Sequence, residues 1–95
     1  MKAEVRRQLH GRLKRIAGQV AGIQRMVDAD RYCVDVLLQI AAVRAALDQA
    51  GKLILGAHVE TCVADAFASG SAVERRKKTE ELLGVFSRFG SVSKR

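Results

Sequence analysis

The chain has 95 residues, which leaves room for one domain, and 48% of them are hydrophobic, so it is expected to fold rather than stay disordered. Proline and tryptophan are absent and aromatic residues make up only 4%, so the core has to be aliphatic and long unbroken helices are permitted. No apolar run approaches the roughly 20 residues that span a membrane, and the N-terminus lacks the apolar core of a secretion signal. The expected location is therefore the cytoplasm.

The net charge of +7 is distributed unevenly along the chain. Within residues 1–25, Glu4 alone is acidic, and the basic residues are Lys2, Arg6, Arg7, Arg12, Lys14, Arg15 and Arg25. A basic segment on an ordered helix favours a polyanionic partner, with nucleic acid before an anionic membrane. The alternative interpretation is an ordinary solvated surface.

The first predicted element is an amphipathic helix from about Ala3 to Val27. Its apolar residues recur at alternating intervals of four and three, the period of a helix with a coiled-coil type of seam, at Leu9, Leu13, Ile16, Val20, Ile23 and Val27. The helix is expected to break between Asp28 and Asp30, and one of these two aspartates is expected to be the N-cap of the next helix.

The second predicted helix runs from Arg31 to about Ala68, and Ser69, Gly70 and Ser71 are expected to end it. A third, shorter helix is predicted from about Val73 to Arg88, followed by a frayed tail at residues 91–95. Residues 1–95 are thus predicted to form one all-α domain with three helices.

Three residues with metal-binding side chains share one stripe of the second helix. Alternating steps of four and three lead from Cys33 to His58, and one more step of four leads to Cys62. His58 and Cys62 are therefore neighbours on one face. Cys33 precedes His58 by so many residues that about 37 Å of continuous helix would separate them, so the two cannot meet within one straight helix.

An antiparallel second copy would bring these residues together. Pairing two chains about a point near Arg44 to Leu47 places Cys33 of one copy against His58 and Cys62 of the other. The alanines of this region would allow close approach, and they are Ala41, Ala42, Ala45 and Ala46. A two-fold dimer would then contain two identical sites, each spanning the subunit boundary.

Two thiolates and an imidazole form a soft, sulfur-rich donor set, which favours Cu(I), whereas Zn²⁺ prefers a fourth ligand. Two alternatives remain open. The cysteines are buried packing residues, or Cys33 and Cys62 form a disulfide or persulfide switch that does not require His58. No catalytic constellation is evident, so the chain is not expected to be an enzyme.

Three stretches of the sequence resemble the copper-sensitive operon repressor family, also called CsoR/RcnR-like metal-sensitive repressors. They are RLKRIAGQVAGIQRM from Arg12, DRYCVDVLLQIAAVRAAL from Asp30 and HVETCV from His58. The resemblance covers nearly the whole chain. It implies an all-helical protomer, an antiparallel four-helix-bundle dimer and a dimer of dimers. It also implies that Cys33, His58 and Cys62 are the Cu(I) ligands of the copper-sensing branch.

Other branches of this family match less well. The nickel and cobalt branch has a His near the N-terminus and a His in place of the second Cys, where this chain has Cys62. The formaldehyde-sensing branch has a proline where this chain has Lys2 and no second Cys, and the persulfide-sensing branch lacks the residue equivalent to His58. The resemblance therefore favours copper.

The resemblance also implies residues that support the metal-bound His. Tyr32 matches a tyrosine just before the first Cys, and a glutamate of the third helix would contact the metal-bound His. Glu81 is favoured for this role over Glu80. Such groups orient the imidazole and tune the metal.

The function implied by the resemblance is that of a transcriptional repressor. The metal-free form would bind operator DNA, and Cu(I) binding would release it, so that copper-resistance genes are expressed. The residues favoured for DNA binding are Arg12, Lys14 and Arg15, supported by Arg44 and the basic cluster at 75–78. A copper buffer and a general DNA-architectural protein remain alternatives.

Overall fold

The computed structural model describes residues 1–90, with the side chains of residues 62, 63, 69, 89 and 90 excepted. The tail expected to fray, residues 91–95, lies outside the described residues. The elements are α1 (Ala3–Asp28), α2 (Cys33–His58), the π-helical turn η1 (Val59–Val63), α3 (Ala64–Ser69) and α4 (Ala72–Gly90). The described part of the chain is all-α, as predicted.

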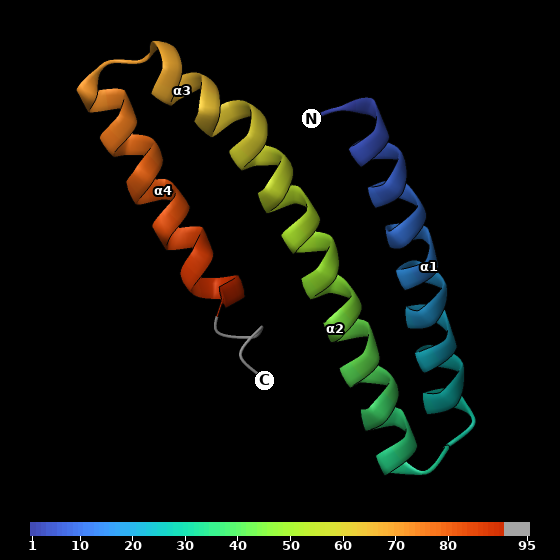
Figure 1. Cartoon of the computed structure of the whole chain (residues 1–95). Coiled ribbons are helices and arrows are strands. Elements are labelled where there is room, and N and C mark those ends of the chain that lie inside the picture. Colours follow the sequence, from blue (N-terminus) through green and yellow to red (C-terminus); the bar gives the residue numbers. More distant parts are fainter. Residues whose placement is uncertain (91–95) are drawn as a thin grey trace.

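The helices fold back on one another (Figure 1). α1 and α2 pack against each other as an antiparallel hairpin, and α2, η1 and α3 follow one another without a break. α4 turns back and packs against α3 and the second half of α2, on the side away from α1. The prediction of three helices is confirmed, and the second of them contains a π-helical turn that was not predicted.

The turn between α1 and α2 corrects the predicted N-cap. Asp28 is the last residue of α1, and Asp30 has a left-handed backbone with φ of 51°. The Arg31 N–H donates to the Met26 carbonyl and the Asp30 N–H to the Val27 carbonyl, at 2.9 and 3.1 Å. This is a Schellman motif, which ends a helix, and Asp tolerates its left-handed position better than most residues. The N-cap of α2 is Tyr32, which makes no capping side-chain bond.

The predicted end of the second helix is confirmed, since α3 stops at Ser69 and α4 begins at Ala72. Gly70 is required here, because a Cβ would lie 2.4 Å from the Ala66 carbonyl oxygen. The Glu74 N–H donates to the Ser71 hydroxyl at 3.2 Å, so Ser71 caps α4.

The predicted seam of α1 separates into two lines of residues. Leu9 and Ile16 are buried and Ile23 is half-buried, and these residues repeat every seven positions. The core between α1 and α2 is completed by Val43, Ala50 and Ala57, which have the same spacing. The other line of the α1 seam is exposed, and it consists of Leu13, Val20 and Val27.

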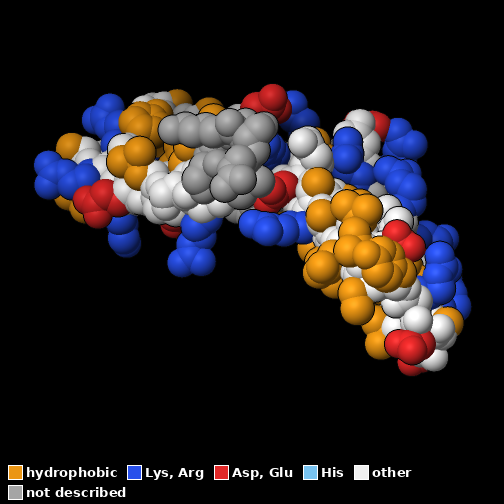
Figure 2. Space-filling view, turned by 90° about the horizontal axis from the view of Figure 1, so that it is seen from below, with side chains coloured by type: hydrophobic (Ala, Val, Ile, Leu, Met, Phe, Trp, Pro, Cys, Tyr) orange, Lys and Arg blue, Asp and Glu red, His pale blue; other side chains and the backbone are white. Residues whose placement is uncertain are grey.

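A second apolar surface remains uncovered on α2. Leu37 is 61% exposed, and Ile40, Leu47 and Ile54 on the same stripe are also exposed. Figure 2 shows hydrophobic side chains gathered over the end of the molecule where α1 and α2 meet, with Lys and Arg along one side. A contiguous apolar surface of this kind on a folded chain is typical of an interface.

Candidate metal centre and nucleic-acid interface

His58 is held where three elements meet. It is the last residue of α2, and its Nε2 atom lies 3.4 Å from Oε1 of Glu81 on α4. The same carboxylate oxygen lies 3.9 Å from Nζ of Lys78. The His58 side chain is 34% exposed, so the imidazole is fixed at one edge and open at another.

Two cavities meet at His58. An apolar one of about 340 Å³ lies between α2 and α4, and its lining residues are Gly51, Ile54, Leu55, His58, Glu81, Leu82 and Val85. A smaller one of about 150 Å³ faces the N-terminus, and its lining residues are Met1, Ile54, Ala57, His58 and Thr61. The sequence pattern did not reveal either cavity, because each depends on how helices distant in sequence pack.

Cys62 lies in the π-helical turn that follows His58, and its side chain is outside the described part of the structure. The Lys2 ammonium lies 3.9 Å from the Glu60 carboxylate, which ties the start of α1 to this turn. Both side chains are largely exposed, so the ion pair contributes little stability.

Cys33 is the first residue of α2 and carries an exposed free thiol. It lies at the end of α2 opposite His58, beside Tyr32, which is 69% exposed. Among the described residues, no three His, Cys, Asp or Glu side chains of one chain come close enough to hold a metal ion. The three-ligand site therefore stays a prediction that requires a second copy.

The structure separates the two glutamates considered for contact with His58. Oε1 of Glu81 lies 3.4 Å from Nε2 of His58, and Glu81 lines the cavity between α2 and α4, whereas Glu80 lines neither cavity at His58. Both glutamates are exposed. Tyr32 is at the far end of α2 from His58 of its own chain, so it can approach only the His58 of another copy.

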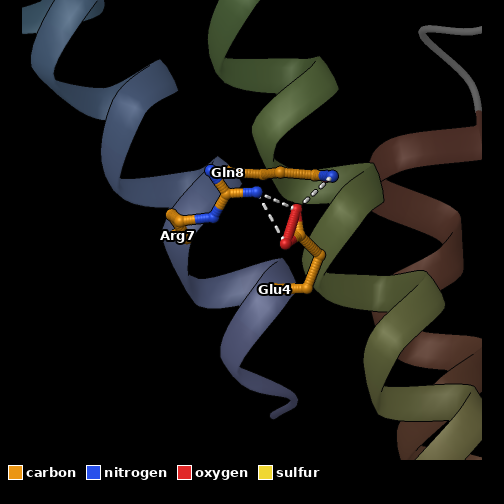
Figure 3. Close-up of polar contacts among 3 residues, drawn as sticks. All are labelled: Glu4, Arg7 and Gln8. Carbon is orange, nitrogen blue, oxygen red and sulfur yellow. Dashed lines mark hydrogen bonds and ion pairs between the residues drawn. The ribbon is translucent and has the colours of Figure 1, made fainter.

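A basic cleft of about 360 Å³ runs along α1. It is lined by Glu4, Arg7, Gln8, Gly11, Arg12 and Arg15. Glu4 accepts bonds from Arg7, one of them at 2.7 Å, and from Gln8 at 3.4 Å (Figure 3). Because this carboxylate offsets the charge of Arg7, Arg12 and Arg15 contribute the net positive charge of the cleft.

Two other basic residues favoured from the sequence lie elsewhere. Lys14 and Arg44 are exposed on α1 and α2 and do not line the cleft. The basic cluster at 75–78 lies near the start of α4, and its last member, Lys78, contacts Glu81. Within residues 1–90, no helix has the length and apolar character needed to cross a membrane.

Comparison with known proteins identifies the family. Residues 5–88 match the model of the family described as metal-sensitive transcriptional repressor. The copper-sensing transcriptional repressor CsoR of Bacillus subtilis (strain 168) is 51% identical over 82 residues, covering 86% of this chain and 78% of the relative. CsoR of Mycobacterium tuberculosis (strain ATCC 25618 / H37Rv) is 39% identical over 89 residues, covering 86% and 75%.

Solved structures share the fold. The copper-sensing repressor CsoR with Cu(I) from Geobacillus thermodenitrificans NG80-2 superposes with a TM-score of 0.82 at 41% identity, covering 95% of this chain and 91% of the other. The nickel-responsive transcriptional regulator InrS has a TM-score of 0.71 at 40% identity, covering 87% and 90%. These relatives are regulators rather than enzymes, which confirms that expectation, and the chain belongs to the family of metal-sensitive transcriptional repressors.

Proposed function

We propose that the protein is a Cu(I)-responsive repressor whose metal-free form binds operator DNA and whose copper-bound form releases it. Cys33 of one protomer and His58 and Cys62 of its partner would hold the metal. The observation that carries the proposal is the position of Cys33 and His58 at opposite ends of one exposed apolar stripe. The copper-sensing relatives, among which the Bacillus subtilis protein is 51% identical, support the choice of effector.

The exposed stripe of α2 supports an antiparallel dimer. Leu37, Ile40, Leu47 and Ile54 lie between the two ligand positions and are open to solvent in the single chain. A two-fold axis near the middle of α2 would bury this stripe against its copy and bring each Cys33 to the opposite His58. The exposed line of α1 would widen the contact into a four-helix bundle, and two dimers would pair into a tetramer.

The donor set fits Cu(I) better than Ni²⁺ or Zn²⁺. Thiolate sulfur is a soft ligand, and two thiolates with one imidazole suit a soft ion of low coordination number. The similar fold of the nickel-responsive InrS shows that the scaffold alone does not choose the metal. The identities of residues 33, 58 and 62 therefore carry the selectivity.

Glu81 gives His58 the orientation that a metal ligand needs. Because Nε2 is directed at the Glu81 carboxylate, Nδ1 is the imidazole nitrogen that would bind the metal. A carboxylate partner fixes the tautomer and ring orientation of a ligating imidazole. Tyr32 of the partner would lie next to the same imidazole, so His58 would link the metal to α4 and to the other subunit.

DNA binding is assigned to the basic cleft of α1. The slope of log affinity against log salt is negative, and we expect Arg15→Ala to reduce its magnitude by about 0.9 for each phosphate that the arginine neutralises. The measurement is fluorescence anisotropy of a labelled duplex over a series of salt concentrations. Arg31→Ala, at an exposed position in the turn between α1 and α2, is the matched control. An unchanged slope in Arg15→Ala would contradict this assignment.

Cu(I)-dependent release is the direct test of the proposed function. Cu(I) is added anaerobically to protein bound to a fluorescent duplex that was selected from a random library with the metal-free protein. We expect the DNA affinity to fall about 5- to 150-fold, the range of a 1–3 kcal/mol coupling. Unchanged DNA affinity at full copper loading would contradict the proposal.

Glu81→Gln should separate copper binding from release. The three ligands remain, so copper uptake should persist, but the amide no longer holds the imidazole as a carboxylate does, and the fall in DNA affinity should shrink. Glu80→Gln, at the exposed neighbouring position, should behave like the wild type. Equal behaviour of the two variants would remove Glu81 from the coupling.

A further inference from the structure

The π-helical turn lies between the two metal-ligand positions that share one chain. His58 ends α2, and η1 spans Val59–Val63, which includes Cys62. At the start of the turn, the Val59 N–H donates to the Leu55 and Gly56 carbonyls, four and three residues back. Directly after the turn, the Ala64 N–H donates to the Val59 carbonyl, five residues back, and also to the Thr61 carbonyl. The backbone therefore changes from α to π geometry between the two ligands.

This change alters where the backbone of position 62 lies around the helix axis relative to position 58. In an α-helix, residues four apart are offset by about 40° around the axis. A wider turn, with bonds to the fifth residue back, advances by a smaller angle per residue. The relative direction of positions 58 and 62 thus depends on the width of this turn, and π-helical turns of this kind are frequent at functional sites.

Thr61 is the residue whose chemistry favours the wider turn. Its hydroxyl donates to the Ala57 carbonyl at 2.9 Å, one turn back and directly before His58. A hydroxyl that bonds the carbonyl four residues back competes with the backbone N–H groups for that oxygen and bends or loosens the helix. The same carbonyl precedes the point at which the backbone bonding changes from four to five residues.

The hydroxyl acts together with a local run of β-branched residues. Thr79 on α4 makes the same kind of bond, to the Arg75 carbonyl at 2.8 Å, and α4 stays α-helical there. The turn after His58 differs because Val59, Thr61 and Val63 are all β-branched, and such residues lower helix propensity by restricting χ1. The bond from Thr61 therefore acts on a segment with a weak preference for the α-helix.

We propose that Thr61 is a positioning residue of the metal centre, whose hydroxyl bond to Ala57 holds the π-helical turn that sets the backbone positions of residues 58 and 62 relative to each other. The inference rests on the proposed function, because it assumes that these two residues bind Cu(I). It assigns Thr61 no contact with the metal.

The test compares variants at two threonines that make the same bond. Thr61→Val keeps the branched shape and removes the hydroxyl, Thr61→Ser keeps the hydroxyl, and Thr79→Val removes the equivalent bond far from the ligands. Cu(I) affinity is measured anaerobically against a chromogenic chelator, and thermal unfolding is measured on the metal-free proteins. His58→Ala is included as the variant that tests the metal site itself.

We expect Thr61→Val to bind Cu(I) roughly 10-fold more weakly than the wild type, because loss of a group that orients the ligands commonly lowers metal affinity by about this factor or more. Its metal-free melting temperature should stay equal or rise, because the loss of the hydroxyl favours a regular α-helix. Thr61→Ser and Thr79→Val should bind copper like the wild type.

Three results would overturn the inference in distinguishable ways. Wild-type copper affinity in Thr61→Val, with affinity lost in His58→Ala, would remove Thr61 and leave the proposed function standing. A weaker copper affinity accompanied by a lower melting temperature would make Thr61 a residue of general stability only. No copper uptake by the wild-type protein would overturn the proposed function, and this inference with it.

Discussion

Two inactive variants should restore copper binding when they are mixed. Cys33→Ala and His58→Ala should each lose more than about 100-fold in Cu(I) affinity, since removal of groups outside the ligand set alone costs 10- to 100-fold. A heterodimer of the two contains one site with all three ligands and one with Ala at both substituted positions. If the chains are unfolded and refolded together at equal amounts, half of the dimers are mixed, and uptake should approach about one Cu(I) per four chains.

The control mixture pairs His58→Ala with Cys62→Ala. His58 ends α2 and Cys62 lies in the η1 turn that follows, so one protomer supplies both ligands of a site. Each site of a mixed dimer therefore lacks one of them, and no tight binding should return. Recovery in this second mixture, or failure in the first, would contradict a site that spans the subunit boundary. The measurement is anaerobic competition with a chromogenic chelator in both cases.

Leu37→Glu should dissociate the protein into single chains. Leu37 is 61% exposed on the stripe between Cys33 and His58, and we infer that the partner covers it. Full burial of an exposed Leu contributes about 1.5–3 kcal/mol, but the partner can bury only the 61% of Leu37 that is still exposed. With two copies per dimer, the loss should be about 2–4 kcal/mol before the cost of a buried charge is added. Copper and DNA binding should be lost together with the dimer.

Leu83→Glu is the matched control for this substitution. Leu83 is 65% exposed, so it is as open as Leu37, but it lies on α4 and outside the stripe. Sedimentation velocity at micromolar concentration should give single chains for Leu37→Glu and an oligomer for Leu83→Glu. An unchanged oligomer in Leu37→Glu would contradict the antiparallel pairing along α2.

Much of the fold follows from the period of the apolar residues. The spacing of four and three in α1, the absence of proline, and the Ser-Gly-Ser segment after residue 68 are local properties, and they predict where the helices lie. Asp30 was misassigned because Asp is favoured both as an N-cap and in the left-handed position that ends a helix. Only the backbone bonds of Arg31 and Asp30 decide between these two roles.

The seam of α1 illustrates a second limit of the sequence. Leu9 and Leu13 have the same character, yet Leu9 packs into the core of the chain and Leu13 stays exposed. The spacing of apolar residues shows which side chains are expected to be buried. It does not show whether another helix of the same chain or a second copy of the chain buries them. Such ambiguity is greatest in a small oligomeric protein, where much of the apolar surface is reserved for contacts between chains.

The candidate site was only partly accessible from the sequence. Helical spacing placed Cys33, His58 and Cys62 on one stripe, but the preference for Glu81 came from the family resemblance, and the 3.4 Å contact with His58 depends on how α4 packs. The π-helical turn depends on a change of backbone bonding that apolar periodicity does not report. The cluster of β-branched residues at Val59, Thr61 and Val63 is the signal that could have indicated it.

The most direct test of the proposed metal centre is an anaerobic titration of the reduced wild-type protein with Cu(I) in the presence of a competing chromogenic chelator. We expect tight uptake of one Cu(I) per chain, and loss of that uptake in Cys33→Ala. Failure of the protein to compete for Cu(I), with both thiols free and reactive, would contradict it and would favour a thiol switch formed by Cys33 and Cys62 on the same helical scaffold.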